Sequence, residues 1–270
     1  MPPSYVKPYV KRGKNDAADA EAICEAVQRS SMRFVPVKSA DQQSVLMLHR
    51  ARDLLIRQRT MLANALRAHF AELGIVTAQG ISKIIELVRV VEDESDARLP
   101  PLARMALRAL TAQIEVLQLQ IRKLEKPIVA WCRTNTASRR LATIPGVGPI
   151  TASAIAATVT DPSCFRSGRQ FAAWLGLVPR QNSSGGKERL GGICKQGDRY
   201  IRRLLVIGAH ALIRYARGKG AVGAPWINSL LDRRPTLVTA VALANKTARI
   251  AWAILARGEA YRSASLVSSS

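Results

Sequence analysis

A loop rich in serine, glycine and lysine is the first candidate for covalent chemistry in this chain. Ser183 and Ser184 precede two glycines and Lys187, and Arg189 follows. Nearby positive charge favours the alkoxide form of a serine and stabilises the charge of a phosphorane-like transition state. No histidine lies close in the sequence to act as a base, and most Ser-Gly loops are plain connections. The loop therefore predicts either a nucleophile for a phosphodiester or an ordinary turn.

A second candidate binds phosphate without reacting with it. Residues 144–149 read IPGVGP, so Gly146 and Gly148 lie two positions apart between apolar helical segments, with Arg139 and Arg140 upstream. A tight turn of this kind lets bare backbone N–H groups approach a phosphate, helped by the N-terminus of the next helix. The segment resembles the helix-hairpin-helix motif of DNA-processing proteins. The alternative is a plain connection between two helices.

A dense set of cations follows the serine loop. Lys195, Arg199, Arg202 and Arg203 have only Asp198 among them. The three arginines are spaced i, i+3 and i+4, so they fall on one side of a helix. A helix face that is only solvated would contain more acids. The scarcity of acids among these cations therefore favours contact with a nucleic-acid backbone.

A pair of carboxylates near the N-terminus could hold a metal ion. Asp16 and Asp19 share one face of an expected helix that Asn15 or Asp16 can cap. Such a pair can bind Mg²⁺ together with phosphate oxygens. Two carboxylates rarely complete a site, and a capping residue beside a surface acid is the alternative.

Two long helices must position these groups. The first is expected from a cap at Ser39 or Asp41 to about Leu73, and the second begins after Pro100-Pro101. Apolar residues of the second recur in alternating steps of three and four, the spacing of a coiled coil. Pairing with a second chain and packing in a hairpin explain this stripe equally well, and Pro127 should bend the helix or end it early. The stripe comprises Leu107, Leu110, Ile114, Leu117, Ile121, Leu124, Ile128 and Trp131.

Composition points to a polyanionic partner. The 270 residues include 41 Lys and Arg against 19 acids, a net charge of +22, and 48% of the residues are apolar, so the chain can bury a core. Nucleic acid is the first reading of this charge, and a ribosome-associated or membrane-surface protein is an alternative.

Several classes of site and protein are disfavoured. The four cysteines form no CxxC pair, which disfavours a zinc site or a disulfide framework and fits a reducing cytosol. The three histidines do not have metal-ligand spacing. No signal peptide is recognised, and the apolar segment 237–256 carries Asn245, Lys246 and Arg249, so we expect no membrane span.

Taken in order, these segments resemble a known family. KNDAADAEAICEA, the helical insertion, IPGVGPITA, WLGLVPRQNSSGGKERLGGICKQGDRYIRRLL and ANKTARIAW together resemble the DEDD-type transposases of bacterial insertion sequences. That family carries a serine in a C-terminal transposase domain and is related to the Piv/MooV invertases and the bridge-RNA-guided recombinases. The resemblance extends from about Tyr5 to Arg262.

The resemblance implies a mainly α chain with three parts and a tail. These are a remnant of a RuvC-like (ribonuclease-H fold) domain over residues 1–40, a helical coiled-coil insertion over 41–137, and an all-α transposase domain with a helix-hairpin-helix over 138–262. Residues 263–270 are expected to be unstructured. The implied partners are insertion-sequence ends and target DNA, a structured guide RNA, and a second copy bound through the coiled coil. The implied location is the bacterial cytoplasm, beside the nucleoid.

The resemblance also assigns roles. It implies that Ser184, or its neighbour Ser183, attacks DNA to form a covalent serine–DNA intermediate, while acid-bound Mg²⁺ from a partner subunit completes the site. Asp16 and Asp19 match the last two acids of a four-acid set. Cys194 stands where serine is expected, and we predict that it is a buried small residue.

The first two acids of that set have no match in this sequence. We therefore expect an N-terminally truncated chain with a half-built metal site that is inactive alone. A non-enzymatic DNA- or RNA-binding remnant, able to associate with a full-length transposase, is the alternative.

Overall fold

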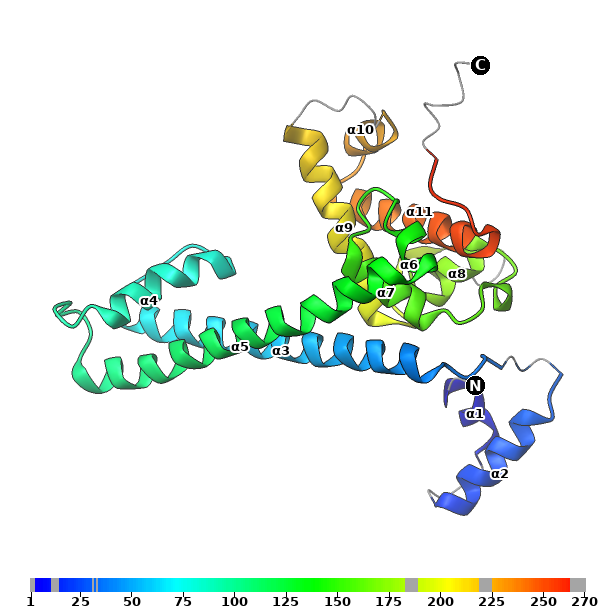
Figure 1. The fold of residues 1–270 in the computed structure, drawn as a ribbon, viewed down its shortest axis with the longest axis horizontal. Coiled ribbons are helices and arrows are strands. Elements are labelled where there is room, and N and C mark those ends of the chain that lie inside the picture. The colour runs from blue at the N-terminus through cyan, green and yellow to red at the C-terminus, as the bar shows by residue number, and fades with distance from the viewer. Residues whose placement is uncertain are drawn as a thin grey trace.

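The computed structural model describes residues 3–10, 15–30, 32, 34–182, 189–218 and 225–262. Within these ranges the chain is mainly helical, as the sequence predicts, and its two strands form one short antiparallel pair. Figure 1 shows short N-terminal helices, a long helical arm, and a group of C-terminal helices at the root of the arm. The expected tail and the tip of the serine loop lie outside the described residues.

The N-terminal helices are α1 (Pro3–Val6), the 3-10 helix η1 (Lys7–Tyr9) and α2 (Asp16–Val27). The Oδ1 atom of Asn15 accepts a hydrogen bond from the Ala18 N–H at 2.6 Å, which confirms the predicted cap. α2 packs on η1 and α1, and Figure 1 shows the group beside the start of the arm. No described residue of the first 39 lies in a strand, so the RuvC-like remnant stays a prediction.

The arm is a hairpin of α3 (Ala40–Glu72) and α5 (Pro101–Thr134). Ser39 and Gln42 form a capping box, each side chain accepting the other's backbone N–H at 3.2 and 3.1 Å, which confirms the predicted start. The register is fixed where Arg52 donates to Glu125 at 2.7 and 2.9 Å. One heptad further along the arm, Arg59 donates to Gln118.

The apolar stripe of α5 faces α3 of the same chain. This arrangement supports the hairpin alternative, because each fully buried side chain contributes about 1.5–3 kcal/mol that a second chain would have to replace. The helix continues through Pro127 to Thr134, so the predicted early end is wrong. Ile128 and Cys132 beyond the proline are buried, and their packing offsets the roughly 3 kcal/mol penalty of an internal proline. The buried stripe residues are Leu107, Ile114, Leu117, Ile121 and Ile128.

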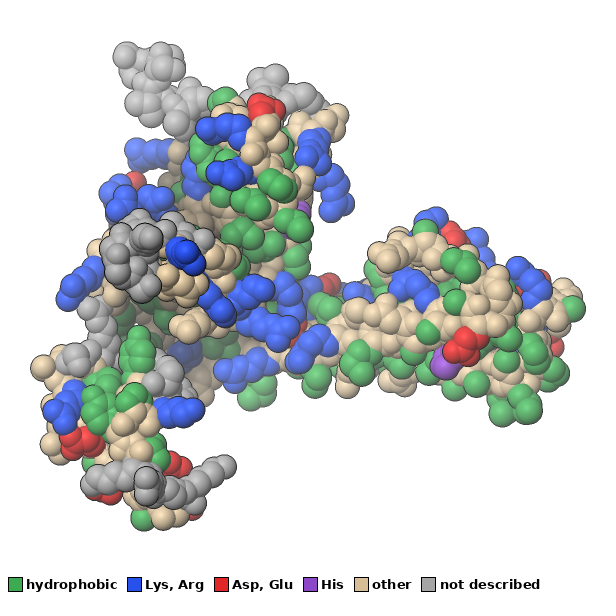
Figure 2. All heavy atoms as spheres, turned by 180° about the vertical axis from the view of Figure 1, so that it is seen from behind, with side chains coloured by type: hydrophobic (Ala, Val, Ile, Leu, Met, Phe, Trp, Pro, Cys, Tyr) green, Lys and Arg blue, Asp and Glu red, His purple; other side chains and the backbone are tan. Residues whose placement is uncertain are grey.

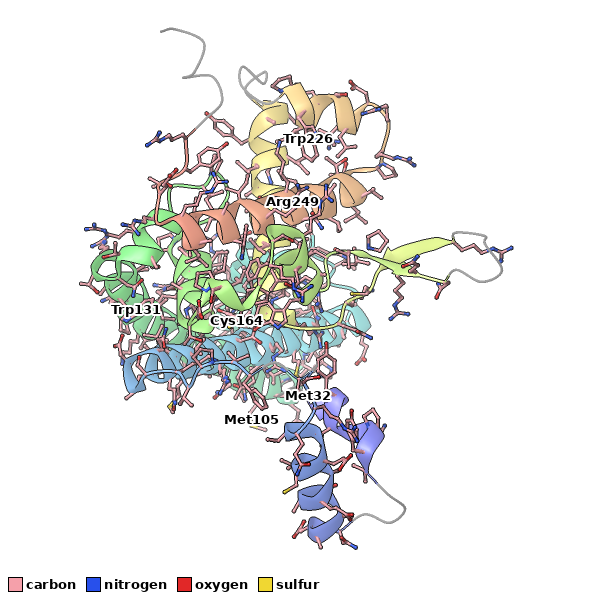
Figure 3. The ribbon with its side chains drawn as sticks, turned by 90° about the vertical axis from the view of Figure 1, so that its right-hand side faces the viewer. Met32, Met105, Trp131, Cys164, Trp226 and Arg249 are labelled. Atoms are coloured by element: carbon pink, nitrogen blue, oxygen red, sulfur yellow. The ribbon has the colours of Figure 1, made fainter. Side chains whose placement is uncertain are left out.

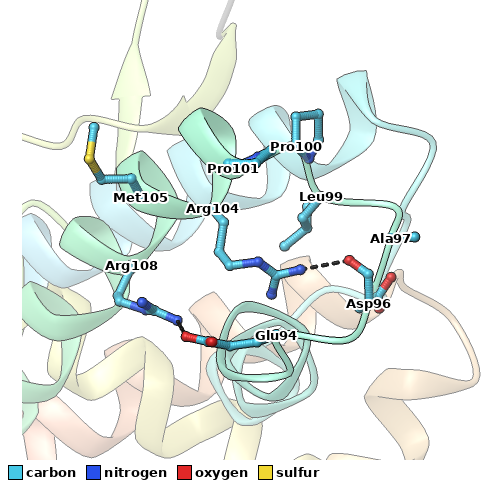
Figure 4. Close-up of a pocket in the computed structure, with 9 residues that line it drawn as sticks. All are labelled: Glu94, Asp96, Ala97, Leu99, Pro100, Pro101, Arg104, Met105 and Arg108. Carbon is cyan, nitrogen blue, oxygen red and sulfur yellow. Dashed lines mark hydrogen bonds and ion pairs between the residues drawn. The ribbon is translucent and has the colours of Figure 1, made fainter.

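The tip of the arm is closed by a buried arginine. α4 (Ile84–Glu92) packs onto α5, and η2 (Ile81–Lys83) precedes it. Arg104 donates to the carbonyls of Val90 and Val91 at 3.0 Å and of Asp96 at 2.6 Å, as well as to that of Asp93. These acceptors include the last carbonyls of α4, which lack partners inside the helix. Figure 4 shows Arg104 reaching toward Asp96, and both residues line a hollow at the tip of the arm.

The C-terminal unit has its own core, in which α11 packs on α8 and α9. Phe171, Ile155, Leu205 and Ala244 are fully or almost fully buried there. The prediction that this unit is all-α is wrong. β1 precedes the serine loop and β2 follows it, and the two strands pair as an antiparallel hairpin. The elements are α6 (Thr136–Leu141), α7 (Pro149–Thr158), η3 (Pro162–Cys164), α8 (Gly168–Trp174), β1 (Pro179–Gln181), β2 (Leu190–Ile193), α9 (Arg199–Gly218), α10 (Pro225–Leu231) and α11 (Thr236–Arg257).

Of the helices that the structure describes, α11 alone is long and apolar enough to cross a membrane. Its alanine-rich side, with Ala240, Ala244, Ala248 and Ala251 fully buried, lies in the core of the C-terminal unit. A helix used in this way is the core helix of a folded unit.

Candidate nucleic-acid interface

The turn between α6 and α7 is built against α9. Gly146 has φ +80, and an added Cβ there would meet Leu212 and the Gly208 carbonyl of α9. An added Cβ at Gly208 would in turn overlap the Gly146 carbonyl oxygen. Ile144 and Val147 are buried on either side. Gly146 is therefore required where the turn approaches α9 closely, a reason that its sequence spacing did not reveal.

Gly148 is the glycine that faces open space. No atom lies within 4 Å of a Cβ added at this position. It is the N-cap of α7, Pro149 follows as the first helical residue, and no described side chain caps this end. The first backbone N–H groups of a helix have no intrahelical partners, and they carry the positive end of its dipole. The start of α7 therefore offers free donors in front of an uncrowded backbone.

These donors open onto a groove of about 720 Å³ between α3, α7 and α9. Its lining is mainly apolar, and Arg52, Arg57 and Arg203 are among the residues that line it. Figure 2 shows Lys and Arg side chains gathered where the arm meets the C-terminal unit. A cleft with free N–H donors at one end and guanidinium groups on its walls suits an anionic backbone. The apolar lining residues are Ile56, Met61, Ile150, Leu204, Ile207 and Ala211.

Two carboxylates hold the arginines of this groove in place. Asp53 accepts from Arg203 and lies 3.6 Å from the Nε of Arg57, while Glu125 accepts from Arg52. Three cations against two carboxylates leave one net positive charge in this cluster. Arg57 is the most exposed of the three, so it is the one best able to turn toward a phosphate.

A buried polar chain joins the arm to the C-terminal unit beside the groove. His49 of α3, 1% exposed, contacts the Tyr200 hydroxyl through Nδ1 at 3.0 Å and Ser153 Oγ through Nε2 at 3.1 Å. Burial, and then the nearby Arg52, lowers the pKa of His49 from 6.5 to about 4. Burial raises the pKa of the Tyr200 hydroxyl. A neutral histidine therefore bonds α3 to both α7 and α9.

The predicted arginine face of α9 divides into three environments. Arg199 is exposed, and Arg203 is half-buried against Asp53 and over the Tyr200 ring. Arg202 is 9% exposed and donates to the carbonyls of Leu175 at 2.8 Å and Gln196 at 3.1 Å. Arg202 therefore clasps the loop before α9 and does not share an exposed face with its neighbours.

The β1–β2 hairpin supports the serine loop. The Asn182 N–H donates to the Arg189 carbonyl at 2.9 Å, so the two residues that flank the serine loop lie side by side. Figure 3 shows the hairpin projecting from the body of the molecule. Arg189 and, in the loop after β2, Lys195 are exposed, whereas Cys194 is half-buried. Ser183, Ser184 and Lys187 lie outside the described residues.

Asp16 and Asp19 lie exposed in the first turn of α2. Figure 3 shows the blue N-terminal helices and the yellow-green β1–β2 hairpin on separate parts of the molecule. Within the part of the chain that the structure describes, no three His, Cys, Asp or Glu residues are grouped to hold a metal ion. Two carboxylates alone fit Mg²⁺ only where phosphate oxygens and water supply the other ligands.

Sequence reasoning missed Arg57, Asp53 and His49. Asp53 had a signal, because it is the only acid in α3 between Asp41 and Glu72, among several arginines. His49 had none, since its partners lie 104 and 151 residues away.

Comparisons with known proteins match both the N-terminal and the C-terminal part of the chain to transposase families. Residues 2–75 match a family model described as DEDD transposase of the IS110 type, and residues 138–221 match the transposase IS116/IS110/IS902 family. A probable family 20 transposase of Pseudomonas aeruginosa is 50% identical over 96% of this chain and 77% of its own length. The transposase for IS1328 of Yersinia enterocolitica is 42% identical over 96% and 77%. The transposase for IS1111A of Coxiella burnetii is 41% identical over 96% and 71%.

Proposed function

Because this chain belongs to the IS110/IS116 family of insertion-sequence transposases, we propose that it binds DNA in the groove between α3, α7 and α9. We further propose that a serine beyond β1 cuts and rejoins the bound strand. The observation that carries the binding site is the uncapped start of α7, which opens at Gly148 onto a groove walled by arginines.

In this proposal the N–H groups at the start of α7 donate to one phosphate. Arg57 and Arg203 hold the neighbouring charge, and Arg199, one turn before Arg203, extends the contact along α9. Lys195, Arg189 and Lys187 continue it toward the serine loop. Arg202 supports this path from inside by fixing the loop before α9. The net charge of +22 also suits a structured guide RNA, a further partner that we propose for these surfaces.

Ser184 is the proposed nucleophile, with Ser183 as its alternative. Its Oγ attacks phosphorus and forms a serine–phosphate ester, while the bond from phosphorus to a sugar oxygen breaks and that oxygen takes up the proton that the serine hydroxyl gives up. The same bond is broken when a new strand end attacks. Arg189 beside the loop supplies the positive charge that such a transition state needs.

Asp16 and Asp19 are proposed to bind Mg²⁺ together with the DNA phosphate. When bound, the ion would neutralise phosphate charge and activate an attacking oxygen. The two carboxylates would hold the ion, and their position in the first turn of α2 keeps them exposed to an incoming strand.

DNA binding is tested first by fluorescence anisotropy with a duplex from an insertion-sequence end. About five phosphate contacts predict a slope near −4.5 for log K against log salt. The double variant Arg57→Ala/Arg199→Ala should flatten that slope by about 1.8, at 0.9 per lost contact. Arg98→Ala at the tip of the arm is the matched control and should leave the slope unchanged. A double variant with the wild-type slope would refute this surface.

The covalent step is tested by trapping. Labelled DNA incubated with the chain and Mg²⁺ should give a product that stays protein-linked in denaturant, and Ser184→Ala should abolish it while DNA affinity stays within about twofold. The second candidate is DNA binding without cleavage, which the uncapped start of α7 and the arginine-lined groove support by themselves. Tight binding with no linked product from the wild-type chain would support that candidate.

A further inference from the structure

One carboxylate engages two cations of the groove at once. The Oδ1 atom of Asp53 accepts a hydrogen bond from Arg203 of α9, and its Oδ2 atom lies 3.6 Å from the Nε of Arg57, one turn further along α3. The Asp53 side chain is 19% exposed, so it lies between α3 and α9 beside the groove. Among the described residues that line the groove itself, none is acidic.

Asp53 binds these arginines in the way that a phosphodiester would. It carries one negative charge, and each of its two oxygens faces a different guanidinium group, as the two non-bridging oxygens of a phosphodiester can do. Arg57 and Arg203 come from different helices, and both line the groove. In the free chain, therefore, Asp53 occupies the donors that a bound strand needs.

Glu125, the other carboxylate beside the groove, has a structural role. Its Oε1 atom accepts from both the Nε and the Nη2 of Arg52, and this pair joins α5 to α3 within the arm. Asp53 makes no such bond within the arm, and Arg203 keeps a second support from the Tyr200 ring, whose centroid lies 5.4 Å from the guanidinium carbon. Arg203 can therefore leave Asp53 without loosening the arm.

We propose that Asp53 is an internal substitute for a DNA phosphate, and that DNA must displace it from Arg57 and Arg203 in order to bind. The inference rests on the proposed DNA-binding function of the groove and concerns how that binding is regulated. In the free chain the carboxylate partly neutralises the two cations, and in the complex it lies near a phosphate of like charge. Both effects lower the affinity for DNA.

The displacement makes the groove selective for a strand over a single phosphate ion. A free ion gains only the contacts at one position, and it must break both Asp53 pairs to obtain them. A strand also reaches the N–H groups at the start of α7 and the side chain of Arg199, so its contacts form together at a high effective concentration. The Asp53 pairs therefore exclude small anions and yield to a polyanion.

The test removes the charge of Asp53 and keeps its shape. Asp53→Asn can still accept a hydrogen bond from Arg203. Glu86→Gln is the matched control, because it breaks the exposed ion pair with Lys83 on α4 and raises the net charge of the chain equally. Both are compared with the wild type by fluorescence anisotropy on a duplex from an insertion-sequence end, at about 0.15 M salt.

Asp53→Asn should bind the duplex about tenfold more tightly than the wild type. This factor lies toward the lower end of the range that a like charge about 4 Å away can produce, because the groove is open to water. Glu86→Gln should stay within about twofold, since salt screens a distant charge. Asp53→Ser removes the same charge from a smaller side chain and should give a similar gain, so the result does not depend on how one variant packs.

A double-mutant cycle tests whether the effect acts through Arg57. Arg57→Ala should weaken DNA binding by a larger factor in the Asp53→Asn chain than in the wild type, because there the arginine no longer has to leave a carboxylate. Equal factors in the two backgrounds would mean that Asp53 acts only through long-range charge, which overturns the inference.

Two further results overturn the inference and leave the proposed function in place. Asp53→Asn with the affinity of Glu86→Gln would show that the carboxylate does not compete with DNA. Weaker binding by Asp53→Asn than by the wild type would show that Asp53 positions the arginines for DNA. Failure of the proposed function looks different, because neither the wild type nor any of these variants would then bind the duplex, and the inference would fall with it.

Discussion

Acidification should loosen the joint between the arm and the C-terminal unit through His49. The pKa of His49 is lowered from 6.5 to about 4 in the folded chain. Between these two values the histidine is mostly protonated in the unfolded chain and mostly neutral in the folded chain. The folded state is therefore favoured above pH 6.5, and this contribution is lost as the pH falls through 4. The full difference of 2.5 pKa units corresponds to about 3.4 kcal/mol.

At pH 5 the expected loss is smaller and can be measured. With these two pKa values, the unfolded histidine is almost fully protonated at pH 5 and the folded one is about one-tenth protonated, which lowers the free energy of unfolding by about 2 kcal/mol relative to pH 7.5. Urea unfolding followed by circular dichroism at both pH values gives this difference. Carboxylates titrate in the same range, so the wild type must be compared with a variant that lacks this histidine.

His49→Gln removes the titration and should shrink the pH-dependent loss by about 2 kcal/mol. His69→Gln is the matched control, because His69 is an exposed histidine of the same helix, and it should keep the wild-type loss. Equal losses in the wild type and His49→Gln would refute the reasoning. They would mean that His49 is hydrated enough to accept a proton without disturbing its contacts with Tyr200 and Ser153.

Three further substitutions separate structural from binding roles. Gly208→Ala should lower the free energy of unfolding by about 1–3 kcal/mol in urea, because its Cβ would overlap the Gly146 carbonyl; unchanged stability would contradict that close approach. Gly148→Ala should keep stability within about 0.5 kcal/mol, since the site is open, yet weaken DNA binding measured by anisotropy by several-fold; wild-type affinity would exclude the start of α7 as a contact. Arg104→Met should cost about 2–4 kcal/mol and speed amide exchange in α4, and unchanged protection of α4 would show that the buried guanidinium is dispensable.

Local signals in the sequence were sufficient for the helices that they specify. The capping box at Ser39 and the cap at Asn15 depend on residues three positions away, so both starts could be predicted. Of the two effects expected of Pro127, a bend or an early end, the early end was wrong because the cost of a proline is local, whereas the burial of Ile128 and Cys132 depends on the tertiary fold. The β1–β2 hairpin was missed because its strands are only three and four residues long.

The sequence was sufficient to predict which residues belong to the candidate site, but not what each of them contacts. Spacing alone puts Arg199, Arg202 and Arg203 on one side of a helix, but the neighbouring loop buries one of them and Asp53 engages another. Gly146 and Gly148 look equivalent in the sequence, and only the approach of α9 separates them. Partners more than a hundred residues apart, such as those of His49, leave no pattern in a single sequence.

α9 connects two points that the proposed reaction must keep in step. At Arg202 it holds the loop that leads from the β1–β2 hairpin, and at Gly208 it contacts the turn that opens onto the groove. Six residues separate these positions, an axial rise of about 9 Å. A helix does not stretch, so α9 fixes the distance between the proposed phosphate contact at the turn and the hairpin that flanks the proposed nucleophile. Inserting one alanine between Arg202 and Gly208 would rotate the hairpin by about 100° relative to the turn between α6 and α7. The proposed nucleophile would then lose its fixed position relative to the proposed phosphate contact.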